Sequence, residues 1–385
     1  MYEPYLGASE CAPPISQNSN CTQAAAQSAT STPTATGTSA QAATSTNAPC
    51  AAANASTQAA TSTPTATGTN APCAAANAST QAATSTNAPC AAAQSATDTP
   101  CAAAPTTTVN LGECLDRVRQ ITPLVHNITN YVTVNDVANA ILACGASPIM
   151  SDEPEDVSDI TSICGGLNIN IGTLHAQSIR AMHIAAKRAR ELGHVILLDP
   201  VGAGASALRT NTAKDLLKEA KPHVLKGNAS EIKALALGES STQGVDANAA
   251  DVVTQDNLDT QVEFAASYAR ALGCIVAITG PIDLVTDGVR TFAIKNGRPE
   301  MEKITGTGCQ IAGIMTAFLV ANPDCHLEAA AAAIACMGIA GEEVWENLLP
   351  CEGNATCRNK MIDAIYNMDG AKLNNRVRFE LFESI

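Results

Sequence analysis

The sequence has few aromatic residues and an excess of acidic over basic side chains. One Trp, five Phe and five Tyr occur in 385 residues, and the formal net charge is −14. Nucleic-acid-binding surfaces are built from basic clusters and stacking aromatics, so this composition argues against a nucleic-acid partner. No apolar run approaches the roughly 20 residues that a membrane-spanning helix needs, so no membrane partner is expected either.

Motifs of several common sites are missing as well. None of the 15 cysteines forms a Cys-x-x-Cys pair and the six histidines show no ligand spacing, so a zinc site is not expected. No Gly-x-x-x-x-Gly-Lys-Ser/Thr stretch occurs, which excludes a P-loop nucleotide site. Neither a secretory signal nor an arginine-rich presequence is apparent, and scattered cysteines in a large domain are typical of a reducing compartment. We therefore expect a cytoplasmic protein.

The chain divides into two parts of different composition. Residues 1–105 contain no Lys or Arg, only three acidic residues, and mostly Ala, Thr, Ser, Asn, Gln, Pro and Cys. The stretch Asn-Ala-Pro-Cys-Ala-Ala-Ala occurs three times there, but the spacing is irregular and large aliphatic residues are nearly absent, so the repeats cannot build a packed core. We predict a low-complexity, disordered arm at 1–105 and a single folded domain at 106–385.

In the second part, apolar runs typical of strands alternate with segments of helical periodicity. Continuous apolar runs such as 195–198 predict strands buried on both faces of a parallel sheet, and Asp287-Gly288 predicts a hairpin turn. The order predicts an α/β fold, a three-layer sandwich with a mostly parallel sheet. The expected strands are 124–126, 146–150, 167–171, 195–198, 223–225, 274–278, 284–286 and 289–294. The expected helices are 111–121, 134–144, 175–192, 212–220, 257–272, one from 311, 327–343 and a last one near 360–367, with others opening near 151–156 and 226–231.

Polar residues and glycines follow the predicted strands at five places. Met150, Gly172, Asp199, Lys226 and Thr279 each come at or just after the carboxyl end of a strand. In open α/β sheets, ligands bind beyond that edge. Five such positions at one edge are harder to explain by packing than by an active site, so we expect an enzyme.

A glycine-rich stretch, Lys-Ile-Thr-Gly-Thr-Gly-Cys-Gln at 303–310, precedes an apolar helix that is expected to start at Ile311. The glycines allow a sharp turn, and the N–H groups and dipole of the helix start form an anion cradle. Cys309 lies in the first turn, where the dipole favours its thiolate. The stretch is typical of a phosphoryl-transfer site with a cysteine available as a base, although a glycine-rich helix start with a buried cysteine is the alternative.

Two carboxylates and a lysine surround this expected site. Asp199 ends a strand, and Glu231 lies in the first turn of a helix two elements further on. Hard oxygen ligands of this kind suit Mg²⁺ bound to substrate phosphates, and Lys226 offers a point charge for a phosphate oxygen. The structural alternatives are a helix cap at Glu231 and a turn before proline at Asp199.

An amide-rich segment follows the first predicted strand. It contains Asn127, Thr129, Asn130 and Asn135, which are more polar side chains than an ordinary connector needs. Caps and turns use the same residue types, so both a structural and a functional interpretation stay open.

Eight motifs in order along the second part carry a resemblance to a known family. They are Pro-Leu-Val-His-Asn-Ile-Thr-Asn-Tyr-Val at 123–132, Ala-Ser-Pro-Ile-Met at 146–150, Asn-Ile-Gly-Thr-Leu at 170–174, Leu-Asp-Pro-Val-Gly-Ala-Gly at 198–204, Gly-Asn-Ala-Ser-Glu at 227–231, Gly-Val-Asp at 244–246, Ala-Ile-Thr-Gly at 277–280 and Thr-Gly-Thr-Gly-Cys at 305–309. Residues 106–385 resemble the hydroxyethylthiazole kinases of thiamine biosynthesis, members of the ribokinase-like superfamily. The arm at 1–105 has no counterpart in the resemblance.

The resemblance implies ATP-dependent phosphorylation of the primary hydroxyl of 4-methyl-5-(2-hydroxyethyl)thiazole, with Mg²⁺ as cofactor. It also implies a homotrimer with the thiazole pocket between subunits. The implied site residues are Cys309 as the catalytic residue, the backbone of 306–309 as the anion hole, Asp199 and Glu231 for Mg²⁺, Lys226, Thr279 and Asp199 for ATP, and Met150 and Gly306 for the thiazole.

The chain departs from the family pattern in three places. Lys226 stands where we expect arginine, so bidentate phosphate contact is lost. The stretch 351–357 replaces a glycine-serine-aromatic loop, and 238–261 is longer than expected.

Several other functions remain as alternatives. Hydroxymethylpyrimidine kinase has a similar Gly-Thr-Gly-Cys loop, and the ATP-dependent NAD(P)H-hydrate dehydratase of the same fold has aspartate where Cys309 stands. A non-catalytic thiazole-binding or scaffold protein is the alternative from another class. The pattern Gly202-Ala-Gly204 favours a dinucleotide-binding dehydrogenase only weakly, because an Asp-Pro precedes it and the helix starts later.

Overall fold

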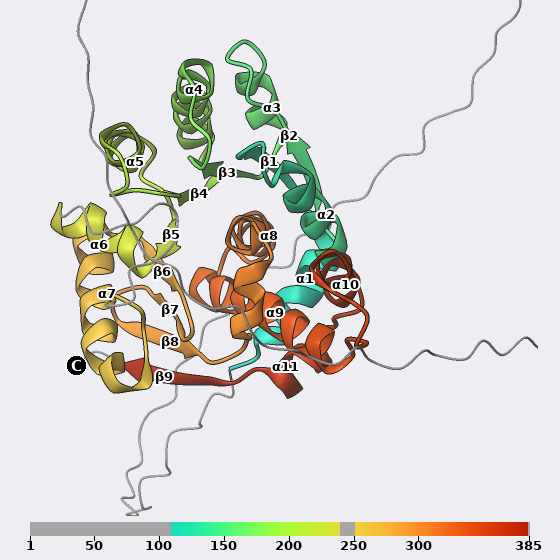
Figure 1. The fold of residues 1–385 in the computed structure, drawn as a ribbon. Helices are drawn as coiled ribbons and strands as arrows, with labels where there is room; N and C mark the ends of the chain where they lie inside the picture. Colours follow the sequence, from blue (N-terminus) through green and yellow to red (C-terminus); the bar gives the residue numbers. More distant parts are fainter. Residues whose placement is uncertain (1–108, 239–250, 384–385) are drawn as a thin grey trace, which may run out of the picture. The chain divides into compact units, whose positions relative to one another are not determined.

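The computed structural model describes residues 109–238 and 251–383 (Figure 1). The predicted arm at 1–105 lies outside these ranges, as do residues 239–250 of the segment that is longer than expected. Both of these predictions therefore stay untested. Within the described ranges no helix has the length and apolar character to cross a membrane.

In the described residues, nine strands form one sheet in the order β2-β1-β3-β4-β5-β6-β7-β8-β9. Neighbouring strands from β2 to β6 are parallel, and β7, β8 and β9 add to that sheet in antiparallel pairs. The predicted hairpin at Asp287-Gly288 is confirmed, with Gly288 at φ 94° in the turn between β7 and β8. The strands are β1 Leu124–Ile128, β2 Ser147–Met150, β3 Gly166–Asn170, β4 Val195–Asp199, β5 Val224–Asn228, β6 Ile275–Thr279, β7 Asp283–Thr286, β8 Arg290–Ile294 and β9 Phe379–Glu383.

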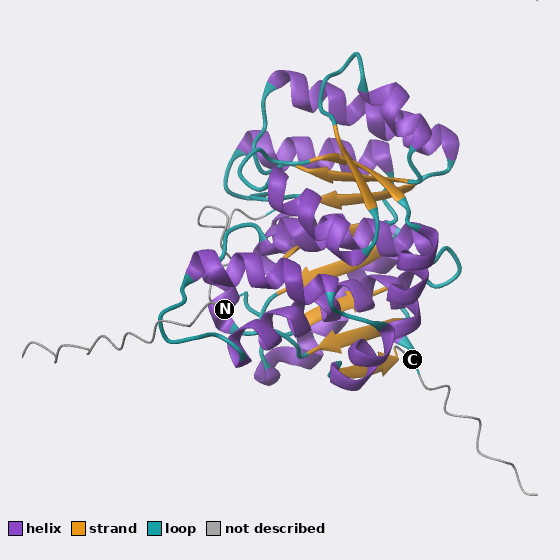
Figure 2. Cartoon of the chain, turned by 90° about the vertical axis from the view of Figure 1, so that its right-hand side faces the viewer, coloured by secondary structure: helices purple, strands orange, loops and turns teal. Residues whose placement is uncertain are grey.

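Helices cover both faces of the sheet and complete the predicted three-layer sandwich (Figure 2). Each face has its own cluster of buried hydrophobic side chains. The helices of the first cluster are α1 Leu111–Ile121, α2 Val134–Cys144, α8 Thr307–Ala321, α9 His326–Glu346, α10 Asn354–Tyr366 and α11 Gly370–Arg376. Those of the second are α3 Val157–Ile163, α4 Ala176–Leu192, α5 Ala207–Ala220, α6 Ala229–Leu237 and α7 Leu258–Leu272. Two short 3₁₀ helices are η1 Gln255–Asn257 and η2 Pro299–Lys303.

The helices α8 and α9 are buried around most of their circumference. Five consecutive alanines at 329–333 of α9 are 0% exposed, and α8 packs against α9, α2, β3 and β4. A helix that is apolar on all sides belongs in the interior, and alanines let the neighbouring backbones approach closely. This packing holds the N-terminus of α8 in a fixed place beside the sheet.

Two predicted element boundaries differ in a way that matters for the site. The helix α5 begins at Ala207 rather than 212, because the Ser206 hydroxyl accepts from the Arg209 N–H at 3.3 Å and caps it earlier. The strand β5 extends to Asn228, so Lys226 lies within a strand rather than at the opening of a helix.

The C-terminal segment differs most from the prediction. The last predicted helix, near 360–367, is α10, but α11 and β9 follow it. All five β9 residues are exposed or half-buried and glutamates interrupt its apolar residues, so no apolar run marks the strand. Its antiparallel pairing with β8 places it. The strand β2 is half-buried, because it forms the edge of the sheet.

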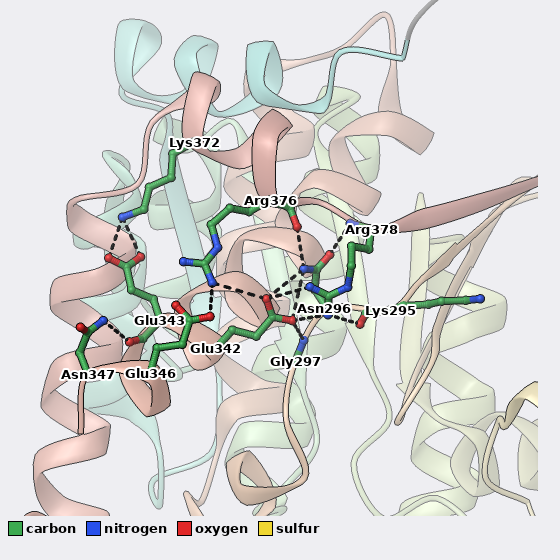
Figure 3. A network of polar contacts seen from close by, with 10 residues as sticks. All are labelled: Lys295, Asn296, Gly297, Glu342, Glu343, Glu346, Asn347, Lys372, Arg376 and Arg378. Carbon is green, nitrogen blue, oxygen red and sulfur yellow. Dashed lines mark hydrogen bonds and ion pairs between the residues drawn. The ribbon is translucent and has the colours of Figure 1, made fainter. Parts of the chain in front are cut away.

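A buried carboxylate, Glu342 of α9, holds the segment that leads into β9 (Figure 3). Arg378 donates to Glu342 Oε1 at 2.6 Å and to Oε2 at 3.2 Å, and Gly297 N donates to Oε1 at 2.8 Å. Asn296 donates to the Arg376 carbonyl at 3.0 Å and accepts from Arg378 N at 2.8 Å. Burial acts to raise the pKa of Glu342, but these donors outweigh it and the pKa is lowered.

Replacing Glu342 by alanine is expected to lower the free energy of unfolding by about 2 kcal/mol, because Gly297 N and the buried Asn296 amide lose an acceptor, whereas the half-exposed Arg378 can be hydrated instead. Since the pKa of Glu342 is lowered on folding, its contribution is present above the ordinary glutamate pKa of about 4.3 and disappears as pH falls through the lower folded value. Thermal unfolding at neutral and acidic pH measures both effects. The control is Glu346→Ala, which removes a more exposed ion pair with Arg376 and should cost less than about 1 kcal/mol. Equal losses in the two variants would contradict the role given to Glu342.

Candidate active site

The parallel strands bring several polar residues to one edge of the sheet. Asn170 and Asp199 are paired in register at the ends of β3 and β4. The predicted strand-end residues are found at this edge, namely Met150, Gly172, Asp199 and Thr279. Lys226 is different: it lies inside β5 and is 3% exposed. Four of the five predicted residues therefore form a row along the carboxyl edge of the sheet, and Lys226 lies further inside the protein.

The start of α8 lies against this row. Gly306 is the N-cap residue with φ 84°, and a Cβ built on it would lie 2.2 Å from Thr133 Cγ2. Glycine is thus required both by the backbone conformation and by the close approach of the loop after β1. The helix begins at Thr307 rather than 311, so Cys309 lies in its first turn, among N–H groups that have no acceptor within the helix.

A buried ion pair joins the sheet to this helix start. Lys226 Nζ lies 3.3 Å from Asp199 Oδ2 and donates to the Gly308 carbonyl at 2.9 Å. Burial alone would lower the pKa of Lys226, but the Asp199 carboxylate outweighs it and the pKa is raised, so the lysine is an ammonium ion. The ammonium thus binds the acid of β4 and the backbone of the glycine-rich turn at the same time.

Asp199 retains one oxygen for a further interaction. Its Oδ2 accepts from Asn170 at 2.8 Å and from Lys226, whereas its buried Oδ1 has no hydrogen-bond partner among the described residues. Burial raises the pKa of Asp199, and the Lys226 ammonium opposes that rise. A buried carboxylate oxygen without a partner is suited to a hard cation or a donor from a ligand.

Glu231 is bound differently from Asp199. Its Oε1 accepts from Gly202 N at 2.7 Å and its Oε2 from Asn228 N at 2.8 Å, in a capping box that opens α6. Burial, followed by the Asp199 charge, raises the pKa of Glu231 to about 7. The helix-cap alternative is therefore realised, and the remaining lone pairs of Glu231 suit contact with a metal-bound water.

The described residues contain no group of three or more His, Cys, Asp or Glu side chains arranged to hold a metal ion. Mg²⁺ is usually held by only one or two carboxylates together with waters and substrate phosphates. The unpartnered oxygen of Asp199 and the nearby carboxylate of Glu231 fit a magnesium site of this type.

Cys309 is 9% exposed and accepts two amide hydrogen bonds at its sulfur. Asn130 Nδ2 lies 3.2 Å and Asn170 Nδ2 3.3 Å from Sγ. Burial, followed by the Asp199 charge, raises the pKa of the thiol above its ordinary value, while Lys226, Asn170 and Thr133 act in the opposite direction. Desolvation therefore opposes the thiolate that the helix dipole is expected to favour, whereas Lys226 and the Asn170 amide support it.

The two asparagines were only partly predicted. Asn130 belongs to the amide-rich segment, but its neighbour Asn127 instead accepts from Asn168 Nδ2 at 3.0 Å, away from the sulfur. Asn168 and Asn170 alternate with apolar residues in β3, a pattern that normally places polar residues on an exposed face. In the structure all five β3 residues are buried, so these two amides lie inside the protein. The only feature of the sequence that could have marked them as site residues is their place at a strand end just before Gly172.

The remaining predicted residues lie on opposite sides of Asp199 in the sheet. Met150 is on the outer strand β2, opposite Asn127 in register, and packs against the hydrophobic cluster that includes Cys309. Thr279 ends β6, and its hydroxyl donates to the Gly227 carbonyl at 3.4 Å. The edge thus has an apolar end at β2, the cysteine and acid in the middle, and a polar end at β6.

A model of the hydroxyethylthiazole kinase family matches residues 115–370. The chain belongs to this family. The hydroxyethylthiazole kinase of Clostridium acetobutylicum is 50% identical to it over 272 residues, covering 71% of this chain and 100% of the relative. That of Ruminiclostridium cellulolyticum is 44% identical over 262 residues, covering 68% of this chain and 94% of the relative.

A solved structure shows the same similarity in three dimensions. It is the hydroxyethylthiazole kinase protein from Pyrococcus horikoshii OT3, with 35% sequence identity and a TM-score of 0.63. The match covers 71% of this chain and 99% of that chain. The sequence resemblance and the predicted α/β fold are both confirmed for this member of the hydroxyethylthiazole kinase family.

Proposed function

We propose that this family member transfers the γ-phosphoryl group of ATP to the primary hydroxyl of 4-methyl-5-(2-hydroxyethyl)thiazole. The observation that carries the proposal is that the start of α8 contacts the Asp199–Lys226 ion pair through the Gly308 carbonyl. In the same turn, the Cys309 sulfur accepts hydrogen bonds from the amides of Asn130 and Asn170. A relative with this activity in its name is 50% identical over its whole length. These features favour the thiazole kinase over the pyrimidine kinase and the hydrate dehydratase.

Phosphoryl transfer needs in-line positioning and charge stabilisation more than covalent chemistry. The first-turn N–H groups of 306–309 would bind the oxygens of the transferring phosphoryl group, and one such donor is worth about 3 kcal/mol in comparable anion holes. The substrate oxygen forms a bond to the γ-phosphorus, and the bond to the bridging oxygen breaks with its electron pair on ADP. The hydroxyl proton goes to the Cys309 thiolate, which makes Cys309 the catalytic base.

Asp199, through its unpartnered Oδ1, and Glu231 would hold Mg²⁺. When bound, the ion would neutralise charge on the phosphate oxygens. Lys226 has a third N–H hydrogen besides those used for Asp199 and Gly308, and it would face a phosphate oxygen. Thr279 would bind ATP from the polar end of the edge.

The thiazole would bind at the apolar end. Met150 offers a polarisable thioether to an aromatic ring, and Gly306 has no side chain to block approach to the backbone. Two large hydrophobic residues follow Asn130 in the loop of the site, Tyr131 at 75% and Val132 at 58% exposure. Exposed apolar residues beside a substrate site suit a subunit contact, which supports a homotrimer with the pocket between subunits.

Release of ADP by the full-length chain tests the activity. With Mg²⁺ and ATP, we expect turnover with the thiazole alcohol and none above background with hydroxymethylpyrimidine. Light scattering on the same preparation gives the oligomeric state, for which a trimer is expected. Turnover with the pyrimidine alone, or with neither alcohol, would contradict the proposed function.

A further inference from the structure

The sulfur of Cys309 lies between two asparagine side chains whose orientations are fixed by other bonds. Asn130 Oδ1 accepts from Thr133 N at 3.1 Å and from Thr133 Oγ1 at 3.0 Å. Its amide nitrogen is then left to donate to Asn170 Oδ1 at 3.1 Å and to Cys309 Sγ at 3.2 Å. Turning this amide over would place an oxygen against the sulfur and lose the two bonds from Thr133.

Asn170 is held in the same manner. Its Oδ1 accepts from Gly172 N at 2.9 Å as well as from Asn130, and its Nδ2 donates to Asp199 Oδ2 at 2.8 Å and to Cys309 Sγ at 3.3 Å. Asn130 is 4% and Asn170 1% exposed, so water does not compete for these groups. We call Asn130 and Asn170 the amide pair.

The amide pair presents only donors to the sulfur. A thiol sulfur is a weak acceptor, whereas a thiolate accepts strong charge-assisted hydrogen bonds. An arrangement with two oriented donors on a buried sulfur therefore matches the anionic form. The neighbouring charges are Asp199 of β4, Lys226 of β5 and, behind them, Glu231 of α6, of which the lysine supports the anion and the acids oppose it.

We propose that Asn130 and Asn170 are positioning residues for phosphoryl transfer, because their amide hydrogens hold the Cys309 sulfur in place to accept the hydroxyl proton. The inference rests on the proposed function for its reaction. In that step the proton leaves the substrate oxygen and forms an S–H bond, while the same oxygen bonds to the γ-phosphorus and ADP departs with the electron pair. Asn170 also contacts Asp199, so it connects the proton acceptor to the phosphate-binding side of the site.

The rate at which iodoacetamide alkylates Cys309, followed by mass spectrometry of its peptide as a function of pH, tests the amide pair. Removing a donor by Asn130→Ala or Asn170→Ala should move the midpoint of this profile up by about one pH unit, which lowers alkylation at neutral pH about tenfold. The midpoint is compared rather than the plateau, because truncation also changes access to the sulfur. The same variants should lower kcat about tenfold or more, with the KM for ATP unchanged in Asn130→Ala.

The chain offers a matched control in Asn168. It is 0% exposed, lies on the same strand as Asn170, and donates to Asn127 Oδ1 at 3.0 Å rather than to the sulfur. Asn168→Ala should change thermal stability without moving the alkylation midpoint. Should Asn130→Ala fail to fold, Asn130→Asp keeps the acceptor for Thr133 and removes the donors, and it should move the midpoint further up.

An unchanged midpoint in folded variants of both Asn130 and Asn170 would overturn the inference and leave them a purely structural role. The alkylation profile requires neither ATP nor a thiazole. If the variants shift the alkylation midpoint but the wild-type chain shows no kinase activity, the proposed function is contradicted. The hydrogen bonds from the amide pair to the Cys309 sulfur would still be supported.

Discussion

Replacing Cys309 by serine is expected to lower kcat by about 10³-fold, within the range seen for loss of a general base. The KM for ATP should change by less than about two-fold, since the sulfur contacts Asn130 and Asn170 rather than the expected nucleotide end of the edge. Serine keeps the size of the side chain, but its hydroxyl is far too weak an acid to supply an anion. Steady-state kinetics with the thiazole alcohol and Mg²⁺-ATP measure both constants.

The control for this substitution is Cys351→Ser, at an exposed cysteine between α9 and α10. It should leave both constants at wild-type values. Unchanged turnover in Cys309→Ser would remove Cys309 from the mechanism and leave charge stabilisation by the helix start as the main catalytic effect.

The pH dependence of the wild-type enzyme follows from the same cysteine. Burial raises the pKa of the Cys309 thiol above its ordinary value near 9, which disfavours the thiolate at neutral pH. Since the proposed proton acceptor is the thiolate, kcat should rise as pH increases from neutral toward alkaline values. The rise should disappear in Cys309→Ser, and a wild-type kcat that falls over this range would contradict the assignment.

The second large effect is expected for Asp199→Asn, which should lower kcat/KM on the order of 10³-fold, the scale of charge-stabilising groups in phosphoryl transfer. The variant keeps the shape of the side chain but removes the charge beside Lys226 and the anionic oxygen available to Mg²⁺. The dependence of the residual rate on Mg²⁺ concentration should weaken as well. A variant that keeps more than about a tenth of wild-type activity would contradict the role given to Asp199.

Glu231→Gln provides the comparison for Asp199→Asn. Both oxygens of Glu231 accept backbone N–H groups of Gly202 and Asn228, so the substitution should reduce thermal stability and cost less activity than Asp199→Asn. Thermal unfolding and steady-state kinetics on both variants separate the proposed catalytic role of Asp199 from the structural role of Glu231, which binds backbone N–H groups of two loops. Larger catalytic loss at Glu231 would reverse these two assignments.

The fold was largely predictable because its signals are local. Apolar runs and helical periodicity give most strands and helices, and the Asp287-Gly288 turn gives the hairpin. The strand β9 was not predictable, since its residues are all exposed or half-buried and are placed by pairing with β8, which is distant in sequence. The early start of α5 was missed although its cap is local, since the Ser206 hydroxyl binds the N–H of Arg209 only three residues further on.

The site was predictable in composition but not in its electrostatics. The positions of Asp199, Cys309 and Gly306 follow from strand ends and a glycine-rich helix start. The raised pKa of Cys309 did not follow, because it depends on burial and on the Asp199 charge. The partners of Lys226 were also hidden, since the Gly308 carbonyl that it binds lies 82 residues further along the chain.

Phosphorus NMR of a reaction containing the full-length chain, Mg²⁺-ATP and 4-methyl-5-(2-hydroxyethyl)thiazole tests the central claim most directly. The account predicts that the ATP signals are replaced by those of ADP and by one new phosphomonoester signal that requires the thiazole. Inorganic phosphate in place of the phosphomonoester would contradict phosphoryl transfer to the alcohol, and unchanged ATP would contradict a kinase at this site.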